Sequence, residues 1–237
     1  MGPLELLAFS PPGWGGVLLR ALLTSLEVAA GGYLVGLLIG VGGAFGKLYG
    51  GPILRDLLEA YTTIIRAVPE LVLIVLVYYA GTDLLNRLMA ALGYARLDIS
   101  GMAAGIAVIG LVQGAYSTEV LRGAIKAVPA GQIETARAYG MPPFLLVRRI
   151  TLPAMLPHAI PGLANLWLIA TKDTALLAVV GFTELTLATR QAGGATREYM
   201  LFFCAAGLLY LMVSLVSNVV IALIERRARR GMPGFSS

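Results

Sequence analysis

The sequence predicts an all-α membrane protein with five transmembrane helices, and three observations support this class. First, 58% of its 237 residues are hydrophobic and only 13% are charged, whereas soluble domains average about 25% charged residues. Second, four long stretches carry no charge, and each approaches or exceeds the length of about 20 residues that crosses a hydrocarbon core. Third, Lys and Arg cluster between particular stretches. Five spans joined by polar loops account for all three observations.

The charge-free stretches define spans one, three, four and five. They contain 19, 20, 22 and 26 residues, and they occupy positions 28–46, 99–118, 150–171 and 199–224. Span two is predicted at 61–81, where Arg66 and Glu70 are the only charges. No polar linker separates one set of spans from another, so residues 1–237 are expected to form a single transmembrane domain.

The positions of the basic residues predict how the chain is oriented. One side collects eleven of the eighteen Lys and Arg residues, namely Lys47, Arg55, Arg122, Lys126, Arg137, Arg148, Arg149, Arg226, Arg227, Arg229 and Arg230. The other side holds Arg20, Arg87, Arg96, Arg190 and Arg197. Cytoplasmic loops carry the excess of basic residues, so the N-terminus is expected outside and the C-terminus inside. The net charge of +5 therefore orients the chain, and no nucleic-acid partner is predicted.

Glycines recur about every four positions in spans one and three. Gly32, Gly36 and Gly40 form one such series, and Gly110 and Gly114 belong to another. Small residues at this spacing let membrane helices approach closely. The series predict close helix packing, either within this chain or against another subunit.

A polar segment between spans three and four resembles the EAA loop of ABC importer membrane subunits. The resemblance rests on Glu134-Thr135-Ala136, Gly140 and the ending Ile150-x-Leu152-Pro153. It implies a coupling loop at 122–154 with a short cytoplasmic helix that docks on an ATPase. The expected contact residues are Glu134, Thr135, Ala136, Arg137, Gly140, Ile150, Leu152 and Pro153. The residue types agree, because Gly140 followed by two prolines is typical of a helix end.

Resemblance to one family extends over nearly the whole chain. Segments 24–27, 61–70, 114–123, 161–165, 172–176 and 223–227 are similar to polar amino-acid permeases of the histidine/lysine/arginine/ornithine and opine type. The chain departs from that pattern at Ala67, where glycine is common, at Thr135, where alanine is usual, and at Asp173, where many members carry serine. The resemblance implies the ABC type I importer permease fold and uptake of polar, basic amino acids or opines by alternating access.

The same resemblance implies several partners and a location. The chain is expected in the bacterial inner membrane, in contact with lipid, an ABC ATPase dimer, a second permease subunit and a soluble periplasmic substrate-binding protein. A sister subunit is favoured over an identical copy as the second permease. ATP and magnesium are expected on the partner ATPase, with no cofactor bound by this chain.

The residues themselves also predict no nucleotide or metal site. Segment 40–48 looks like a phosphate loop, but Val41 and Leu48 stand where that motif needs Gly and Ser or Thr. His158 is the only histidine and Cys204 the only cysteine, so no metal ligand set and no intrachain disulfide are expected.

Charges inside the spans are the candidate substrate-binding residues. Ionisable groups at the bilayer centre cost about 2.5–3.5 kcal/mol on insertion scales, so they usually face a cavity or a partner. Arg66 and Glu70 lie four residues apart, which on one helix places them on one face. Two interpretations stay open: a self-neutralising structural pair, or a carboxylate for a cationic substrate with Arg66 balancing it or binding a substrate carboxylate.

A second charged segment interrupts span four. Lys172, Asp173 and Thr174 are candidates for substrate contact or for packing against the sister subunit, and Asn165 lies seven residues earlier on nearly the same face. Glu119 and Arg122, at the end of span three, are assigned to a gate or a structural salt bridge rather than to the substrate site.

Two function classes follow from these observations. The leading one is the importer permease, a non-catalytic subunit whose ATP is hydrolysed by a separate protein. The alternative is an ATP-independent secondary transporter or channel, in which the intramembrane charges would bind ions or protons. The polar segment 134–153 favours the first class, because a channel has no need of an ATPase contact.

Overall fold

The computed structural model describes residues 5–95 and 100–228, and these residues contain helices and loops but no strand. Five helical segments are long and apolar enough to span a membrane, namely Gly15–Tyr49, Glu70–Ala91, Gly101–Lys126, Pro143–Val180 and Tyr199–Ala228. The predicted fold class is therefore confirmed. Arg96, Arg229 and Arg230, which were assigned to the two sides of the membrane, lie outside the described residues.

The α-helices, in chain order, are α1 (Gly15–Tyr49), α2 (Pro52–Ala67), α3 (Glu70–Leu76), α4 (Thr82–Ala91), α5 (Gly101–Lys126), α6 (Ala130–Ala138), α7 (Pro143–Leu146), α8 (Leu152–Asp173), α9 (Leu185–Thr196) and α10 (Tyr199–Ala228). Short 3₁₀ or π segments complete the helical structure at Glu5–Leu7, Val77–Gly81, Val147–Thr151 and Thr174–Val180. The π segments make α3 continuous with α4 and α7 continuous with α8.

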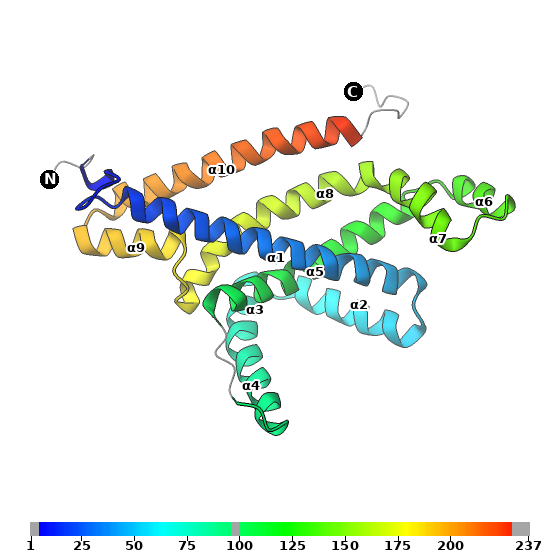
Figure 1. Cartoon of the computed structure of the whole chain (residues 1–237), viewed down its shortest axis with the longest axis horizontal. Coiled ribbons are helices and arrows are strands. Elements are labelled where there is room, and N and C mark those ends of the chain that lie inside the picture. Colours follow the sequence, from blue (N-terminus) through cyan, green and yellow to red (C-terminus); the bar gives the residue numbers. More distant parts are fainter. Residues whose placement is uncertain (1–4, 96–99, 229–237) are drawn as a thin grey trace.

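The long helices α1, α5, α8 and α10 run along the long axis of the molecule, as Figure 1 shows. One end carries α6, α7 and the turn between α1 and α2. The other end carries α9 and the start of α1. Helix α4 extends away from the bundle. The first residue of α1 and the last of α10 lie at opposite ends, as an odd number of membrane crossings requires.

Helices α1 and α5 pack closely through their glycines. A Cβ atom added at Gly36 would lie 2.7 Å from the Cβ of Gln113, and one added at Gly114 would lie 2.7 Å from Cγ2 of Ile39. Neither position has room for a side chain. The alternative left open by the sequence is thus decided for these glycines, which pack helices within this chain.

The prediction of one continuous span at 61–81 was wrong. Helix α2 ends at Ala67, Val68 is extended with φ −96° and ψ 138°, and a new helix starts at Glu70. Pro69 causes the break, because proline has no N–H for the helix and disfavours helical backbone in the residue before it. The span starts at Glu70, and α2 is a separate helix of which only Thr62 and Ile65 are buried.

Helix α2 is tied to the bundle by Tyr61. Its hydroxyl group donates a 2.5 Å hydrogen bond to the carbonyl oxygen of Leu111 on α5. Burial raises the pKa of Tyr61 to about 12, so this hydroxyl keeps its proton at neutral pH. The contact holds the last part of α2, and hence Arg66, beside the middle of α5.

The buried apolar residues form separate clusters along the bundle. Leu18, Leu185 and Phe202 join α1, α9 and α10 at one end. Ala44, Leu121 and Met155 join α1, α5 and α8 towards the other end. Helix α10 contributes only Phe202 and Ala206 to the buried set. Most of its apolar surface therefore faces lipid or a partner.

Candidate functional site

The break at Pro69 separates two candidate substrate-binding residues. Arg66 lies in the last turn of α2, whereas Glu70 is the first residue of α3. They do not share a helix face, and the ion pairs among the described residues do not include one between them. The self-neutralising pair considered from the sequence is therefore wrong.

Glu70 instead contributes to a polar cluster formed by α3, α5 and α8. Its carboxylate interacts with the side chains of Tyr116 and Asp173. Gln113 on α5 donates a 3.2 Å hydrogen bond from Nε2 to Oδ2 of Asp173. Asp173 is 8% exposed and Gln113 is fully buried. The tertiary structure thus brings Glu70 and Asp173 together, although they are distant in the sequence.

This cluster has unused hydrogen-bonding capacity. Among the described residues, Oε1 of Gln113 is one of the buried side-chain atoms without a hydrogen-bond partner. Buried polar atoms without partners are costly. Two neighbouring carboxylates also repel each other where the dielectric constant is low. A ligand that supplies N–H donors and a positive charge would relieve both costs.

Two basic residues lie near the acidic cluster. Arg66 interacts electrostatically with Tyr116, and Lys172 interacts with Asp173. Both basic residues are exposed. An amino acid carries a positive and a negative group. The carboxylates of this region can bind the positive group, and the nearby basic side chains can bind the negative one.

The other two candidates, Asn165 on α8 and Thr174 in the 3₁₀ segment that follows α8, are placed less directly. Thr174 is fully buried, and its Oγ1 donates a 2.9 Å hydrogen bond to the carbonyl oxygen of Thr171. Asn165 is exposed on α8. Gln113 and Tyr116 are cluster members that sequence reasoning missed. Their position six and three residues before Glu119 in span three was the only available signal.

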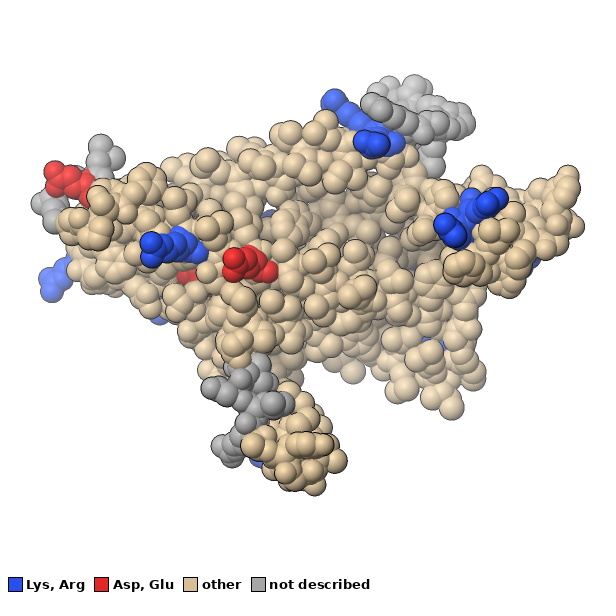
Figure 2. Space-filling model, in the orientation of Figure 1, with Lys and Arg blue, Asp and Glu red and all other residues tan. Residues whose placement is uncertain are grey.

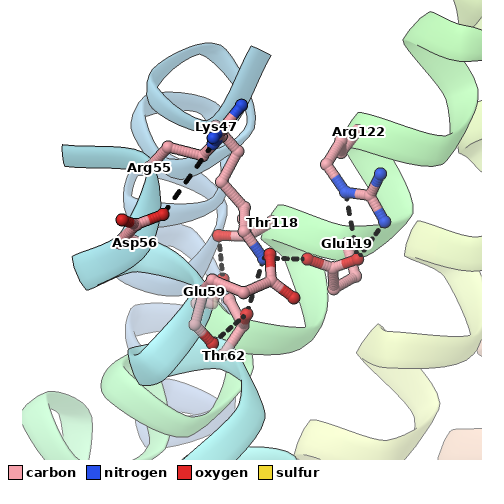
Figure 3. A network of polar contacts seen from close by, with 9 residues as sticks. Lys47, Arg55, Asp56, Glu59, Thr62, Thr118, Glu119 and Arg122 are labelled. Atoms are coloured by element: carbon pink, nitrogen blue, oxygen red, sulfur yellow. Dashed lines mark hydrogen bonds and ion pairs between the residues drawn. The ribbon is translucent and has the colours of Figure 1, made fainter. Parts of the chain in front are cut away.

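A second polar network links α1, α2 and α5 near the end that carries α6 (Figure 3). The Nζ atom of Lys47 lies 2.6 Å from Oε1 of Glu119 and 2.7 Å from Oε2 of Glu59. It also donates a 2.7 Å hydrogen bond to Oγ1 of Thr62. Arg122 binds the second carboxylate oxygen of Glu119, with Nη2 at 2.6 Å. Glu119 and Arg122 thus form a salt bridge, which is one of the two roles expected for them from the sequence; the other, a gate, stays a prediction.

Lys47 was assigned from the sequence to the cytoplasmic loop after span one. It lies instead in the last turn of α1, with its side chain 2% exposed. A lysine can be buried in this way because three oxygen atoms from two other helices surround its ammonium group. These partners could not be predicted from the sequence, because they lie 12 to 72 residues further along the chain.

The predicted coupling loop contains the short helix α6. The helix ends at Ala138, and Gly140 adopts a left-handed conformation with φ +71°. The amide of Gly140 donates to the carbonyl oxygen of Arg137 at 2.9 Å, which closes the helix end. The helix end expected at this glycine is confirmed.

Helix α6 exposes most of its surface. Glu134, Thr135 and Arg137 are exposed, whereas Ala136 is buried. Thr135, Ala136 and Ile150 line one groove of about 560 Å³ together with Gly131, Gln132, Tyr139 and Met141. Leu152 and Pro153 lie outside this groove, at the start of α8.

Two aromatic residues of the loop were not singled out from the sequence. Tyr139 is 86% exposed and Phe144 is 76% exposed. Large apolar side chains at such exposure favour a protein contact. The loop therefore presents a groove lined in part by Tyr139, and a second exposed aromatic side chain, Phe144, on α7, which together are suited to binding another protein.

A buried carboxylate at the opposite end of the bundle was also missed. Glu184 is fully buried and caps the start of α9, accepting hydrogen bonds from the amides of Thr186 and Leu187 at 2.9 Å. Ser25 on α1 and Tyr210 on α10 donate to the same carboxylate. Glu184 thus connects three helices, and burial raises the pKa of its carboxyl group above the ordinary value of 4.5.

Comparison with known proteins decides the family of this chain. Residues 32–230 match the family model described as "Binding-protein-dependent transport system inner membrane component". The chain belongs to this family. The match covers the polar cluster, the network around Lys47 and the coupling loop. It supports the importer permease, and it does not support the alternative of an ATP-independent secondary transporter or channel.

Named relatives agree with the family match. The histidine/lysine/arginine/ornithine transport system permease protein HisQ of Escherichia coli (strain K12) is 40% identical over 220 residues, covering 93% of this chain and 96% of the relative. The octopine transport system permease protein OccQ of Rhizobium radiobacter is 38% identical over 229 residues, covering 96% and 97%. The chain is a polar amino-acid ABC permease by this similarity.

Solved structures are similar in fold. An amino acid ABC transporter crystallised with histidines matches with a TM-score of 0.77 at 25% identity, covering 90% of this chain and 95% of that one. The MetNI methionine ABC transporter, in an inward-facing conformation, also has a TM-score of 0.77, at 20% identity over 93% and 100% of the two chains. The type I importer permease fold predicted from the sequence is confirmed.

Proposed function

We propose that this permease imports basic amino acids or opines, and that Glu70 and Asp173 bind the cationic group of the substrate. The observation that carries this proposal is the acidic cluster itself, in which two carboxylates from different spans meet beside Gln113, whose Oε1 is buried without a partner. Relatives named for histidine, lysine, arginine, ornithine and octopine support the same substrate class.

The two charged ends of such a substrate fit the surrounding residues. A guanidinium or ammonium group can donate hydrogen bonds to both carboxylates, and bonds between ionised groups are about twice as strong as neutral ones. Arg66 and Lys172 lie near enough to interact with the same cluster, so we assign them to the substrate carboxylate. Asn165 on α8 and Thr174 just after it stay predicted contacts.

The coupling loop is the proposed contact with an ABC ATPase dimer. Glu134, Arg137 and the exposed face of α6 would dock on that protein, which binds ATP and magnesium and hydrolyses the nucleotide. A second permease, favoured to be a sister subunit, would complete the path, and a soluble binding protein would deliver substrate. Closure of the ATPases would then reshape the bundle by alternating access, with the α6 end of the molecule in the cytoplasm.

Ligand-induced stabilisation of the intact complex tests the substrate class. The complex is purified with its native partners, and its melting temperature is measured with arginine, lysine, histidine, ornithine, octopine, glutamate and leucine. We expect stabilisation by one or more of the first five compounds and none by glutamate or leucine. Stabilisation by glutamate alone would contradict the proposal, because the acidic cluster would repel a second carboxylate. Uptake into proteoliposomes should also require ATP.

A further inference from the structure

An apolar groove runs between α8 and α10. None of its lining residues belongs to the acidic cluster, to the network around Lys47 or to the contacts of Glu184. Its volume is about 440 Å³, and Tyr33 of α1 forms part of its floor. Ala164 and Trp167 line it from α8, and Val220 and Ile224 line it from α10. In the space-filling view the surface is hollowed between α10 and the helices beneath it (Figure 2).

The polar atoms of this groove are already paired with each other. Trp167 donates a 3.0 Å hydrogen bond from Nε1 to Oγ of Ser217, and Tyr33 donates a 3.1 Å hydrogen bond to the carbonyl oxygen of Leu163. What remains is an aliphatic and aromatic surface. The groove therefore suits a hydrocarbon ligand, and it has nothing to offer a polar substrate.

The hydrogen bond between Trp167 and Ser217 also limits the width of the groove. It joins α8 and α10 directly. A transmembrane helix of a second subunit is about 10–12 Å across with its side chains. Such a helix cannot enter between two helices that touch, whereas a single extended acyl chain can lie along the seam between them.

A positive charge stands where the groove reaches the end of α10. Arg227 follows Val220 by seven residues and Ile224 by three, so helical geometry places it on the face that lines the groove. Helical geometry places Arg226 on the opposite side of α10 and Glu225 just outside the face that lines the groove. Lys and Arg side chains gather at this end of α10 in Figure 2, and Arg148 and Arg149 precede α8 at the same end of the molecule.

We propose that this groove binds one acyl chain of an anionic phospholipid, whose phosphate group is held by Arg227. The acyl chain lies in the groove and contacts Tyr33, Trp167 and Ile224. The phosphate pairs with a guanidinium at the membrane interface, where such headgroups lie. The lipid joins α8 to α10, a helix whose own contacts with the bundle are few, and this role is independent of the transported substrate.

Retention of lipid by the purified transporter complex tests the proposal. Native mass spectrometry is used to count bound lipid after titration with phosphatidylglycerol or phosphatidylcholine. Arg227→Gln should lower phosphatidylglycerol retention by about fivefold, the value of one basic residue near an anionic surface. Arg226→Gln removes the same charge from a different helix face, and it should change retention by less than about twofold.

Filling the groove tests the acyl-chain part independently. Ala164→Phe from α8 and Val220→Phe from α10 should each lower retention of both lipids at this site and remove the stabilisation that phosphatidylglycerol gives the complex. Equal effects of Arg226→Gln and Arg227→Gln would overturn the proposal in favour of general surface charge. Loss of the second permease from both Phe variants, with phosphatidylglycerol retained, would overturn it in favour of a protein partner.

Discussion

Lys47 differs from the other basic residues at its end of the molecule because its side chain is only 2% exposed. Its ammonium group binds one oxygen atom each of Glu59, Thr62 and Glu119, and thereby joins α1 to α2 and α5. Removing one partner of a buried ion pair leaves the other charge uncompensated. We therefore expect substitution of a single polar side chain to lower the stability of this protein more, the more deeply that side chain is buried.

Lys47→Met keeps a long side chain but removes the charge, and we expect it to lower the free energy of unfolding by about 3 kcal/mol. Arg55→Met is the matched control, because Arg55 is 61% exposed and its ion pair with Asp56 is long, at 3.9 Å. The control should change stability by less than about 0.5 kcal/mol. Thermal unfolding of both variants in detergent measures the difference. Equal effects would show that the network around Lys47 does not stabilise the fold.

Glu70→Gln tests the substrate cluster. The variant removes a charge-assisted contact to a cationic ligand, and we expect the KM for arginine or lysine to rise about tenfold. Because the neighbour of Glu70 is Asp173 and not a cation, the protein itself should lose no thermal stability. Uptake of arginine and of a neutral amino acid is measured beside the melting temperature. An equal loss for both substrates together with a lowered melting temperature would contradict a role in substrate selection.

Glu184 should make stability depend on pH. Burial raises the pKa of its carboxyl group above 4.5, so the folded state binds a proton more tightly than the unfolded state. Its contribution is fully present below the unfolded pKa and is lost as pH rises through the folded pKa. Glu184→Gln removes this titration, and its single amide oxygen can replace only one of the two carboxylate oxygens that accept from Thr186 and Leu187, a loss that does not depend on pH. The melting temperature of the wild type relative to this variant should fall from pH 4 to 8, and a constant difference would contradict the assignment.

At the scale of the element, α6 is a short helix held by few contacts and ended by a glycine. Its apolar Ala136 packs inward while Tyr139 is almost fully exposed. Gly140 has a positive φ of +71°, and no atom lies within 4 Å of the position that a Cβ would take. Substitution there strains the backbone and changes the presented face without disturbing the membrane spans.

Gly140→Arg should leave the protein inserted but abolish transport and the stimulation of ATP hydrolysis by substrate. The left-handed backbone costs a non-glycine residue about 1–2 kcal/mol, and the added cation lies on the proposed docking face. Gly51→Arg is the control, because Gly51 also has open space around its Cβ position but a negative φ of −66°. Normal uptake by Gly140→Arg at normal expression would remove the coupling role of α6.

At the scale of the whole molecule, the two ends of the bundle differ in charge. Described basic residues assigned to the cytoplasm, including Lys126 on α5, Arg137 on α6 and Arg227 on α10, lie at the end that carries α6 and α7 (Figures 1 and 2). Arg190 lies on α9 at the opposite end. This separation of charge predicts one orientation in the membrane.

Single-cysteine labelling measures that orientation. In a Cys204→Ser background, cysteines at positions 87 and 190 should react from outside with an impermeant reagent, and cysteines at 137 and 229 only from the cytoplasm. Arg229 lies beyond the described residues, so position 137 is the structural reference for the cytoplasmic end. Labelling at 137 from outside would reverse the topology, and with it the side on which an ATPase can bind.

The sequence by itself determined the class of the protein, the number of its spans and the polar segment that forms α6. These features depend on local properties, namely the hydrophobicity of a stretch, the sign of its flanking charges and the effect of a glycine on a helix end. The break at Pro69 is also local in origin, although the hydrophobic pattern of 61–81 concealed it.

The tertiary structure alone decided which polar groups meet. Glu70 interacts with Asp173, Lys47 with Glu119, and Ser25 with Glu184, and none of these pairs is close in the sequence. Charge-free stretches show where helices cross a membrane, but not how the helices are rotated or how deeply they pack. Burial, and hence the strength of each polar contact, depends on that packing, because water is excluded only where several helices converge.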